Sequence, residues 1–206
     1  VVAIPATTRT VVVGDIHGCF DELCELLAKV EYDSSRDRLI FVGDLVNKGP
    51  KSSEVVQYAR EHHVLCVRGN HDDAALSNYY AWKRAPADAL PAKYDYVRAF
   101  SEADVAFLEQ LPFTITLPNQ SAIIVHAGLV PGVPLDEQEP INMYKMRWLT
   151  QPVDAAGSPV GPWNASETLP SGGDGMAHME AKAWAAQWPG PLHVIFGHDA
   201  KRGLQK

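Results

Sequence analysis

The chain has 206 residues, enough for one domain with a substantial core and too few for two typical domains. Hydrophobic residues make up 46% and charged residues 21%, which is ordinary for a globular protein and gives no indication of a disordered chain. The 18 basic and 25 acidic residues give a net charge of −7, which argues against broad, sequence-independent nucleic-acid binding.

The cysteine count and the lengths of the apolar runs restrict the compartment. Three cysteines are too few, and too irregularly spaced, for a disulfide framework or a zinc ribbon. No apolar stretch approaches the roughly 20 residues that a membrane span needs. We expect a reduced, intracellular and cytoplasmic protein that makes no use of a membrane. The sequence does not predict the oligomeric state.

The first half of the chain alternates between strand and helix patterns. Apolar runs rich in β-branched residues predict strands buried on both faces, and apolar residues at helical spacing separate them. This β-α-β-α-β order implies parallel strands joined by right-handed crossovers. The predicted elements are strands ending at Val13, Val42 and Val67, and helices over residues 20–30, from Ser52 or Ser53 onward, and from Asp72 or Asp73 towards Trp82.

The second half has a less regular pattern. A prolonged surface crossing is expected over residues 85–96, and a capping box at Ser101 predicts a short helix that ends before Pro112. Residues 114–117 and 122–125 are typical of a β-hairpin. Pro, Gly and Ser dominate residues 131–175, which predicts long active-site loops with little regular structure. Residues 176–188 are expected to be helical and residues 192–196 to form a strand.

Five short motifs follow five of the predicted strands. In open α/β sheets, ligands bind beyond the carboxyl ends of the strands, so these motifs should converge on one polar site. A single Gly-Asp-x-His-Gly is often only a turn, but five such segments in order favour a metal centre. The motifs are Gly14-Asp15-Ile16-His17-Gly18, Gly43-Asp44-Leu45-Val46-Asn47-Lys48-Gly49, Gly69-Asn70-His71-Asp72, His126-Ala127-Gly128 and Gly197-His198-Asp199-Ala200.

The side chains in these motifs suffice for two divalent ions. A carboxylate that bridges two such ions is the arrangement of many phosphate-ester hydrolases, in which a shared water ionises near neutral pH and attacks phosphorus. The mixed nitrogen and oxygen ligands admit Mn, Fe, Zn or Co and do not choose among them. The predicted ligands are Asp15, His17 and Asp44 for one ion and Asn70, His126 and His198 for the other, with Asp44 shared.

The ordered motifs resemble those of the calcineurin-like metallophosphoesterases of the phosphoprotein phosphatase superfamily, over nearly the whole chain. The resemblance implies a single α/β domain over residues 1–206, with two packed mixed β-sheets flanked by helices. It also implies that His71 hydrogen-bonds the phosphate and protonates the leaving group, and that Arg68 belongs to the site. Asp72 stands where a glutamate is commoner. Related chains continue with further strands, so we expect this domain to lack its C-terminal strands.

Within that superfamily, the motifs resemble one branch more than the others. Serine/threonine protein phosphatases carry Asp-Arg where this chain has Asn47-Lys48, and His-Gly-Gly where it has His126-Ala127-Gly128. His-Ala-Gly, Gly-His-x-Ala and the segment around Arg147 are instead similar to the symmetrical diadenosine tetraphosphatases and their eukaryotic ApaH-like relatives. Some of those relatives act on capped messenger RNA ends.

Position 47 gives this choice independent chemical support. An aspartate there would pair with His71, raise its pKa and keep it a proton donor, whereas Asn47 supplies less of that help. Expelling a serine alkoxide requires a strong acid partner, because its conjugate acid is about as weak as water, at about 15.7. A nucleoside diphosphate leaves without such help, because its terminal phosphate has a pKa near 6. Asn47 therefore favours phosphoanhydride substrates.

The predicted function is metal-dependent hydrolysis of a dinucleoside polyphosphate, with diadenosine tetraphosphate cleaved to two ADP. Lys48 and Arg147, with Arg68 behind them, are predicted to bind the phosphates, since lysine and arginine are the usual phosphate ligands. Three alternatives stay open: a serine/threonine protein phosphatase, an RNA 5′-cap pyrophosphatase and a catalytically silent binding module.

Overall fold

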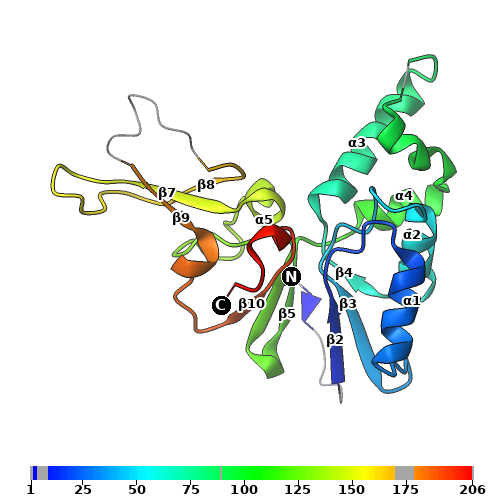
Figure 1. Ribbon diagram of the computed structural model, residues 1–206, viewed down its shortest axis with the longest axis horizontal. Helices are drawn as coiled ribbons and strands as arrows, with labels where there is room; N and C mark the ends of the chain where they lie inside the picture. Colours follow the sequence, from blue (N-terminus) through cyan, green and yellow to red (C-terminus); the bar gives the residue numbers. More distant parts are fainter. Residues whose placement is uncertain (1, 4–8, 89, 170–178, 206) are drawn as a thin grey trace.

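The computed structural model describes residues 2–3, 9–88, 90–169 and 179–205. Two β-sheets pack face to face at the centre of the molecule (Figure 1). Helices α1 to α4 cover the outer face of the first sheet, whereas a short helix and a third small sheet lie beyond the second. No helix in the described ranges is long and apolar enough to span a membrane.

The first sheet is parallel in all its described pairs, with β3 at its centre. Each crossover carries a helix, as the alternating pattern predicts, and the amphipathic faces of these helices pack on the sheet. Its strands are β2 (Arg9–Val13), β3 (Asp37–Phe41) and β4 (Leu65–Cys66), and its helices are α1 (Phe20–Lys29), α2 (Ser52–Glu61), α3 (Asn70–Arg84) and α4 (Glu102–Glu109).

The segment after α3 is more regular than predicted at its end, where a 3-10 helix, η1 (Ala92–Ala99), packs against α3. The predicted capping box at the start of α4 is confirmed: Ser101 Oγ accepts a hydrogen bond from the Asp104 amide, and the Asp104 carboxylate accepts one from the Ser101 amide. Arg60 Nε on α2 lies 2.9 Å from Asp104 Oδ1, which ties these two helices together.

The second sheet is mixed, with strand order β1-β5-β6-β10. The predicted hairpin is confirmed: β5 (Thr114–Leu117) pairs antiparallel with β6 (Ala122–Val125) through the 3-10 turn η2 (Pro118–Gln120). The outer strands, β1 (Val2–Ala3) and β10 (His193–Ile195), run parallel to β5 and β6 respectively.

Apolar side chains fill the space between the two sheets. Ile40 and Val42, in and after β3, meet Ile115 of β5 and Ile124 of β6 in one buried cluster. Burying each such side chain stabilises the fold by about 1.5–3 kcal/mol relative to leaving it exposed. This packing fixes the carboxyl ends of the strands of both sheets relative to one another, and those ends carry the motifs.

Two expectations for the second half are wrong. Residues 131–175 hold regular structure within their described part: α5 (Pro140–Lys145), β7 (Trp148–Pro152) and β8 (Asn164–Ser166). The helix expected over residues 176–188 is instead β9 (Met179–Ala183), followed by a 3-10 turn, η3 (Trp184–Gln187), while residues 176–178 lie outside the described ranges. Antiparallel pairing of β9 with β7 over five residue pairs outweighs the helix propensity of its Met, Glu, Ala and Lys residues.

The expectation of two packed sheets in an α/β fold is confirmed, with two differences. The first sheet is parallel where a mixed sheet was expected. Beyond the second sheet, the antiparallel sheet β8-β7-β9 stands where helices were expected. Trp184 is fully buried beneath this third sheet, where it meets Phe196, so the C-terminal segment is held against it.

Candidate metal centre

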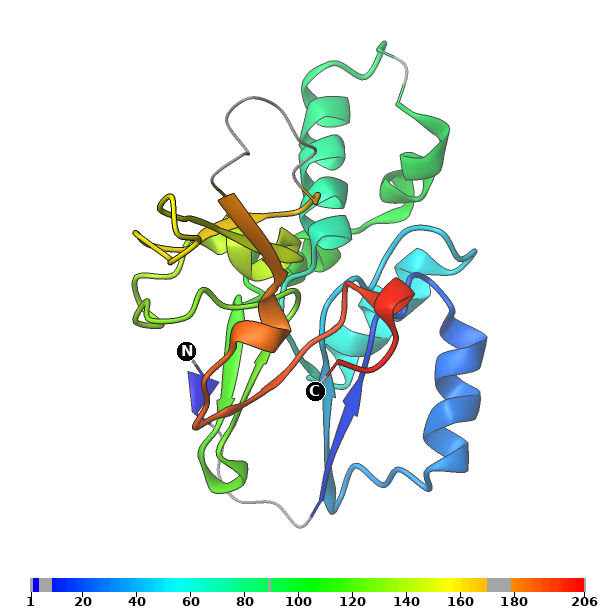
Figure 2. The ribbon, with the colours of Figure 1, turned by 60° about the vertical axis from the view of Figure 1, so that its left-hand side comes forward.

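All five motifs lie at the same edge of the two sheets, because the strands that carry them run in the same direction (Figure 2). Backbone hydrogen bonds then join the motif loops to one another. The amides of Ile16 and His17 donate to the Asp44 carbonyl, and the Gly197 amide donates to the His126 carbonyl. The predicted ligands therefore converge through the backbone as well as through their side chains.

Several of the predicted site residues have a backbone conformation that L-residues rarely adopt. Outside glycine, positive φ occurs at eight positions of the described chain, and five of them are predicted site residues: His17, Asp44, Asn47, Lys48 and His198. Such conformations are costly for residues with a side chain and concentrate at functional sites, where the surrounding structure holds them. The strain marks the same loops as the motifs.

Asp44 lies at the centre of the cluster, with 2% of its side chain exposed. Its Oδ2 lies 3.6 Å from His17 Nε2, and its Oδ1 lies 3.4 Å from His126 Nε2. Asp15 Oδ2 lies 3.7 Å from His17 Nε2. Two sets of potential ligand atoms, each within 4.8 Å of one another, share Asp44: one with His17 and His71, the other with His126 and His198.

Each of the three histidines predicted to bind metal directs one ring nitrogen towards a backbone carbonyl. His126 Nδ1 donates to the Val42 carbonyl over 2.7 Å, and His17 Nδ1 donates to that of Val46 over 3.1 Å. His198 Nε2 donates to the Lys145 carbonyl over 3.1 Å, so α5 orients this histidine. In a neutral ring the other nitrogen then carries a lone pair, which is the form that binds metals.

Those free nitrogens face oxygen atoms that are acceptors as well. Asn70 Oδ1 lies 3.1 Å from His126 Nε2 and 2.9 Å from His198 Nδ1. Because His126 and His198 each donate their ring N–H to a backbone carbonyl, the lone pairs of their other ring nitrogens face the lone pairs of Asn70 Oδ1. A cation relieves that repulsion, and nitrogen with carboxylate and amide oxygen suits first-row divalent ions. The residues therefore fit the divalent metals that the motifs imply.

The pKa shifts agree with a site built for cations. Burial lowers the pKa of His198 to about 3, helped by the neighbouring His126 and by the positive charge of Arg147, so this ring is neutral at pH 7. Burial alone would raise the pKa of Asp44, but the neighbouring His126 side chain and the hydrogen bond from the His71 amide outweigh burial and bring the pKa to about 2. Asp44 is thus ionised throughout the physiological range.

Asp72 holds two of the motif loops in place. Its Oδ2 accepts hydrogen bonds from the amides of Asp44 and Gly69, and its Oδ1 accepts one from the amide of Leu45, all at 2.8–2.9 Å. Burial and the nearby charge of Asp44 raise the pKa of Asp72 to about 7. The three amide donors oppose this rise, because they favour the ionised carboxylate. The aspartate at this position links the loop after β3 to the start of α3.

Two glycines allow the close approach of these loops. A Cβ at Gly69 would lie 2.2 Å from both the nitrogen and Oδ1 of Asp44, and a Cβ at Gly197 would lie 2.1 Å from Asp15 Oδ1. Neither position has room for a side chain. The Asp15 carboxylate uses the space beside Gly197 to accept a hydrogen bond from the His198 amide over 3.0 Å.

Asn47 and His71 form a hydrogen-bonded pair beside the cluster. Asn47 Oδ1 accepts a hydrogen bond from the Lys48 amide over 2.9 Å, so its Nδ2 donates to His71 Nδ1, also over 2.9 Å. The neutral His71 ring therefore carries its proton on Nε2, which lies 3.9 Å from Asp44 Oδ2. Burial lowers the pKa of His71, and the positive charges of His17 and Lys48 oppose the effect of Asp44.

The three residues predicted to bind phosphate lie in different surroundings. Lys48 Nζ lies 2.6 Å from His17 Nε2, inside the cluster. Arg147 lines a cavity that opens beside His17 and His198. Arg68 is turned towards the end of α4, where it donates to the carbonyls of Leu108 and Glu109. The phosphate-binding roles of all three residues stay predictions.

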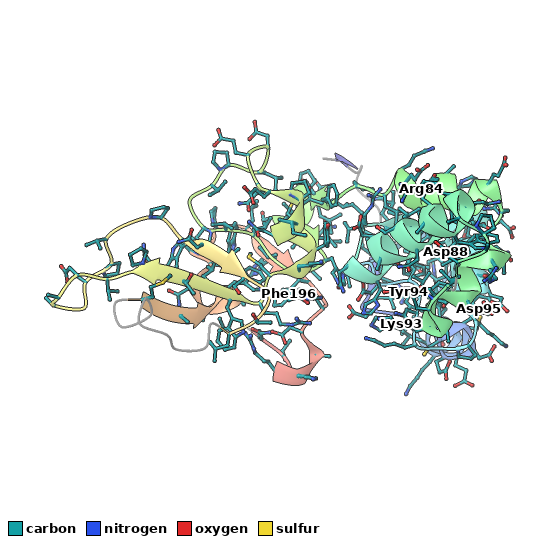
Figure 3. All side chains as sticks on the ribbon, turned by 90° about the horizontal axis from the view of Figure 1, so that it is seen from above. Arg84, Asp88, Lys93, Tyr94, Asp95 and Phe196 are labelled. Atoms are coloured by element: carbon teal, nitrogen blue, oxygen red, sulfur yellow. The ribbon has the colours of Figure 1, made fainter. Side chains whose placement is uncertain are left out.

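A cavity of about 920 Å³ opens beside Asp15, His17 and His198. Such a volume lies in the range of small-molecule sites, which span roughly 300–1,000 Å³. Phe196 lines this cavity and lies near the junction of the two halves in Figure 3, whereas Arg84 and Tyr94 belong to the α3–η1 side. Sequence reasoning placed Asp199 in a motif without giving it a role, and it missed Lys201 and Arg202, which also line the cavity and belong to no motif.

The chain is similar to curated bacterial proteins named symmetrical bis(5′-nucleosyl)-tetraphosphatase. The protein of Coxiella burnetii (strain Dugway 5J108-111) is 38% identical over 126 residues, which are 60% of this chain and 43% of that protein. The protein of Klebsiella pneumoniae (strain 342) is 37% identical over 125 residues, which are 59% of this chain and 44% of that protein. The chain thus matches less than half the length of these relatives.

A solved structure and a family model extend the similarity to the whole chain. The crystal structure of a candidate diadenosine tetraphosphatase, 34% identical in sequence, superposes with a TM-score of 0.78 over 100% of this chain and 82% of that one. The family model described as calcineurin-like phosphoesterase matches residues 8–202. With its strand-end motifs and paired ligand sets, the chain belongs to the calcineurin-like phosphoesterase family.

Proposed function

We propose that this protein hydrolyses phosphoanhydride bonds with divalent metal ions, and that its substrate is a dinucleoside polyphosphate cleaved symmetrically to nucleoside diphosphates. The observation that carries the reaction class is Asp44, a buried carboxylate shared by two sets of ligand atoms. The names of the similar bacterial proteins support the substrate class.

Six side chains would hold the ions, which we propose to be two in number and drawn from Mn, Fe, Zn or Co. When bound, such ions supply Lewis acidity at the phosphate oxygens and a water molecule that ionises near neutral pH. The proposed ligands are Asp15, His17, Asp44, Asn70, His126 and His198.

The remaining site residues would bind and orient the substrate. The Nε2–H of His71 would donate a hydrogen bond to a phosphate or leaving-group oxygen, and Asn47 would keep that proton on Nε2. Lys48 and Arg147 would bind non-bridging phosphate oxygens, Arg147 through its planar fork and Lys48 as a point charge.

The Asn47–His71 hydrogen bond supports an anhydride over a phosphoserine substrate. An amide that donates to Nδ1 stabilises the neutral ring, and a neutral imidazole is a poor proton donor to a leaving group. A nucleoside diphosphate needs no strong acid to leave, because its terminal phosphate has a pKa near 6. A serine alkoxide does need one, since its conjugate acid is about as weak as water.

Product analysis by chromatography tests the proposal. Purified protein with Mn²⁺ or Co²⁺ would be given diadenosine tetraphosphate, a phosphoserine peptide and a capped RNA in parallel. We expect ADP as the sole nucleotide product of the dinucleotide. Turnover of the peptide alone would establish a protein phosphatase, and preferential cleavage of the RNA cap would establish a cap pyrophosphatase. Either result would overturn the proposed substrate.

A further inference from the structure

Two arginines from distant parts of the sequence lie together in the wall of the cavity. Arg147 directly precedes β7, and Arg202 ends the 3-10 turn η4 (Ala200–Arg202). Both line the cavity that also exposes His17 and His198. Figure 2 shows the C-terminal segment with η4, in red, between the two halves of the molecule.

One buried carboxylate orients both arginines. Asp199 Oδ1 lies 3.7 Å from Arg147 Nε, and Asp199 Oδ2 lies 3.2 Å from Arg202 Nε. Only 7% of the Asp199 side chain is exposed, so its negative charge faces the two guanidinium groups rather than solvent. Because one carboxylate serves two guanidinium groups, this trio keeps a net positive charge. Glu167 lies 3.5 Å from Arg147 Nη1 at the exposed rim.

Arg202 is further held by an aromatic ring. Its Cζ lies 3.8 Å from the centre of the Trp148 ring, a cation–π contact. Its Nη1 donates to the Arg147 carbonyl over 3.3 Å, while its Nη2 makes no hydrogen bond within the described ranges. With 23% of the side chain exposed, this fixed fork still presents a donor to the cavity. A pre-oriented fork loses little rotamer entropy when it binds an anion.

We propose that Arg202 is a second polyphosphate-binding residue, which together with Arg147 holds the phosphates beyond the one that reacts, and that Asp199 is its positioning residue. The proposal deepens the proposed function and rests on it. The Asp44 cluster and Lys48 would engage the reacting phosphate. A dinucleoside polyphosphate carries further negative phosphates, and the arginine pair is the cationic group of the cavity wall that is oriented for them. A phosphomonoester lacks those phosphates.

The kinetic test compares a long and a short substrate. Arg202→Gln would be assayed with diadenosine tetraphosphate and with p-nitrophenyl phosphate in Mn²⁺. We expect KM for the dinucleotide to rise about 10- to 100-fold, the range for a lost charge-assisted hydrogen bond, with kcat changed less than about threefold. Activity on p-nitrophenyl phosphate should stay within about twofold. Asp199→Asn should shift KM in the same direction, and Asp199→Glu should restore part of the loss.

Lys201→Gln is the matched control, because Lys201 neighbours Arg202, carries the same charge and makes no hydrogen bond or ion pair in the described part of the chain. It should change KM less than about twofold. An equal effect of Lys201→Gln and Arg202→Gln would overturn the proposal, since general charge would then explain both. An equal loss on both substrates in Arg202→Gln would also overturn it, because Arg202 would then maintain the centre itself.

A binding measurement separates this proposal from the proposed function. Calorimetry with inorganic tripolyphosphate and metal-free protein should give a Kd at least about tenfold weaker for Arg202→Gln than for the wild-type chain. If the wild-type chain did not cleave the dinucleotide but this difference held, the proposed function would fail and the arginine pair would stand. If the dinucleotide were cleaved and neither Kd nor KM changed, the arginine pair would fail alone.

Discussion

Asn47→Asp would place a carboxylate where the Asn47 amide now donates to His71 Nδ1 over 2.9 Å. The amide stabilises the neutral ring, because it offers a donor to the nitrogen that would be protonated. A carboxylate of nearly the same size accepts a hydrogen bond from Nδ1–H and stabilises the protonated ring. The substitution therefore raises the pKa of His71 with little change in packing.

The size of the effect follows from the protonated fraction of His71. Burial lowers the pKa of His71 from its ordinary range, so most of the rings are neutral at pH 7. An opposite charge within hydrogen-bond distance shifts a pKa by about 1–3 units, and burial of the new carboxylate offsets part of this. A net rise of the pKa therefore increases the protonated fraction at pH 7, by at most about tenfold for each unit of the rise. Hydrolysis of the alkyl ester gains because more of the rings can protonate its alkoxide leaving group, whereas hydrolysis of the anhydride gains little.

The assay is kcat/KM for a phosphoserine peptide and for diadenosine tetraphosphate, from pH 6 to pH 8. In Asn47→Asp, the ratio of peptide to dinucleotide activity should rise severalfold, by at most about tenfold, at pH 7, and the difference should shrink at lower pH, where the wild-type ring is protonated as well. Asn47→Ala removes the donor without adding charge and should give no such gain. A ratio that stays unchanged or falls in Asn47→Asp would refute the reasoning.

Three further substitutions test the scaffold of the centre. Gly69→Ala should cost about 1–3 kcal/mol in urea denaturation and weaken Mn²⁺ binding, because its Cβ would lie 2.2 Å from the Asp44 nitrogen. Asp72→Asn should also cost about 1–3 kcal/mol, because an NH₂ group would replace a carboxylate oxygen that accepts hydrogen bonds from backbone amides, and donor would then face donor. Asp37→Asn should make the free energy of unfolding fall less steeply as the pH is lowered into the acid range. A hydrogen bond from an arginine lowers the pKa of Asp37 to about 2 from 3.8, so its contribution is complete above about pH 4 and lost as pH falls through about 2.

Each of these predictions has an outcome that contradicts it. Gly14→Ala is the control for the glycine, since a Cβ there meets nothing within 4 Å, and it should cost no more than about 0.5 kcal/mol. Equal losses at Gly14 and Gly69 would contradict the close-approach argument. A stable Asp72→Asn variant with unchanged Mn²⁺ affinity would show that the three amides need no carboxylate. If the free energy of unfolding fell as steeply with decreasing pH in Asp37→Asn as in the wild type, other carboxylates would be responsible for that fall.

The parts of the structure that could be predicted are those with a repeated physical signature. Buried parallel strands are continuous apolar runs, so those ending at Val13 and Val42 stand out, and polar residues after such runs share one edge of the sheet. Ser101 marks the start of α4 because its capping box is local in sequence. The convergence of Asp15 and His198, 183 residues apart, follows from the topology rather than from their neighbours.

The parts that could not be predicted depend on contacts between distant residues. Met179–Ala183 has a helix-favouring composition and becomes a strand only because β7 is available to pair with it. The carbonyl of Lys145 that orients His198 leaves no mark in the sequence, since every residue carries one. Arg202 is held against Trp148, more than 50 residues away along the chain, and no periodicity records that contact.

The shared role of Asp44 is the central claim, and anomalous diffraction from crystals soaked in Mn²⁺ tests it most directly. We expect two anomalous peaks, one on each side of the Asp44 carboxylate, with the first bound by Asp15 and His17 and the second by His126 and His198. A single peak, or two peaks of which one is not bound by Asp44, would contradict the dinuclear centre and the hydrolytic function proposed for it.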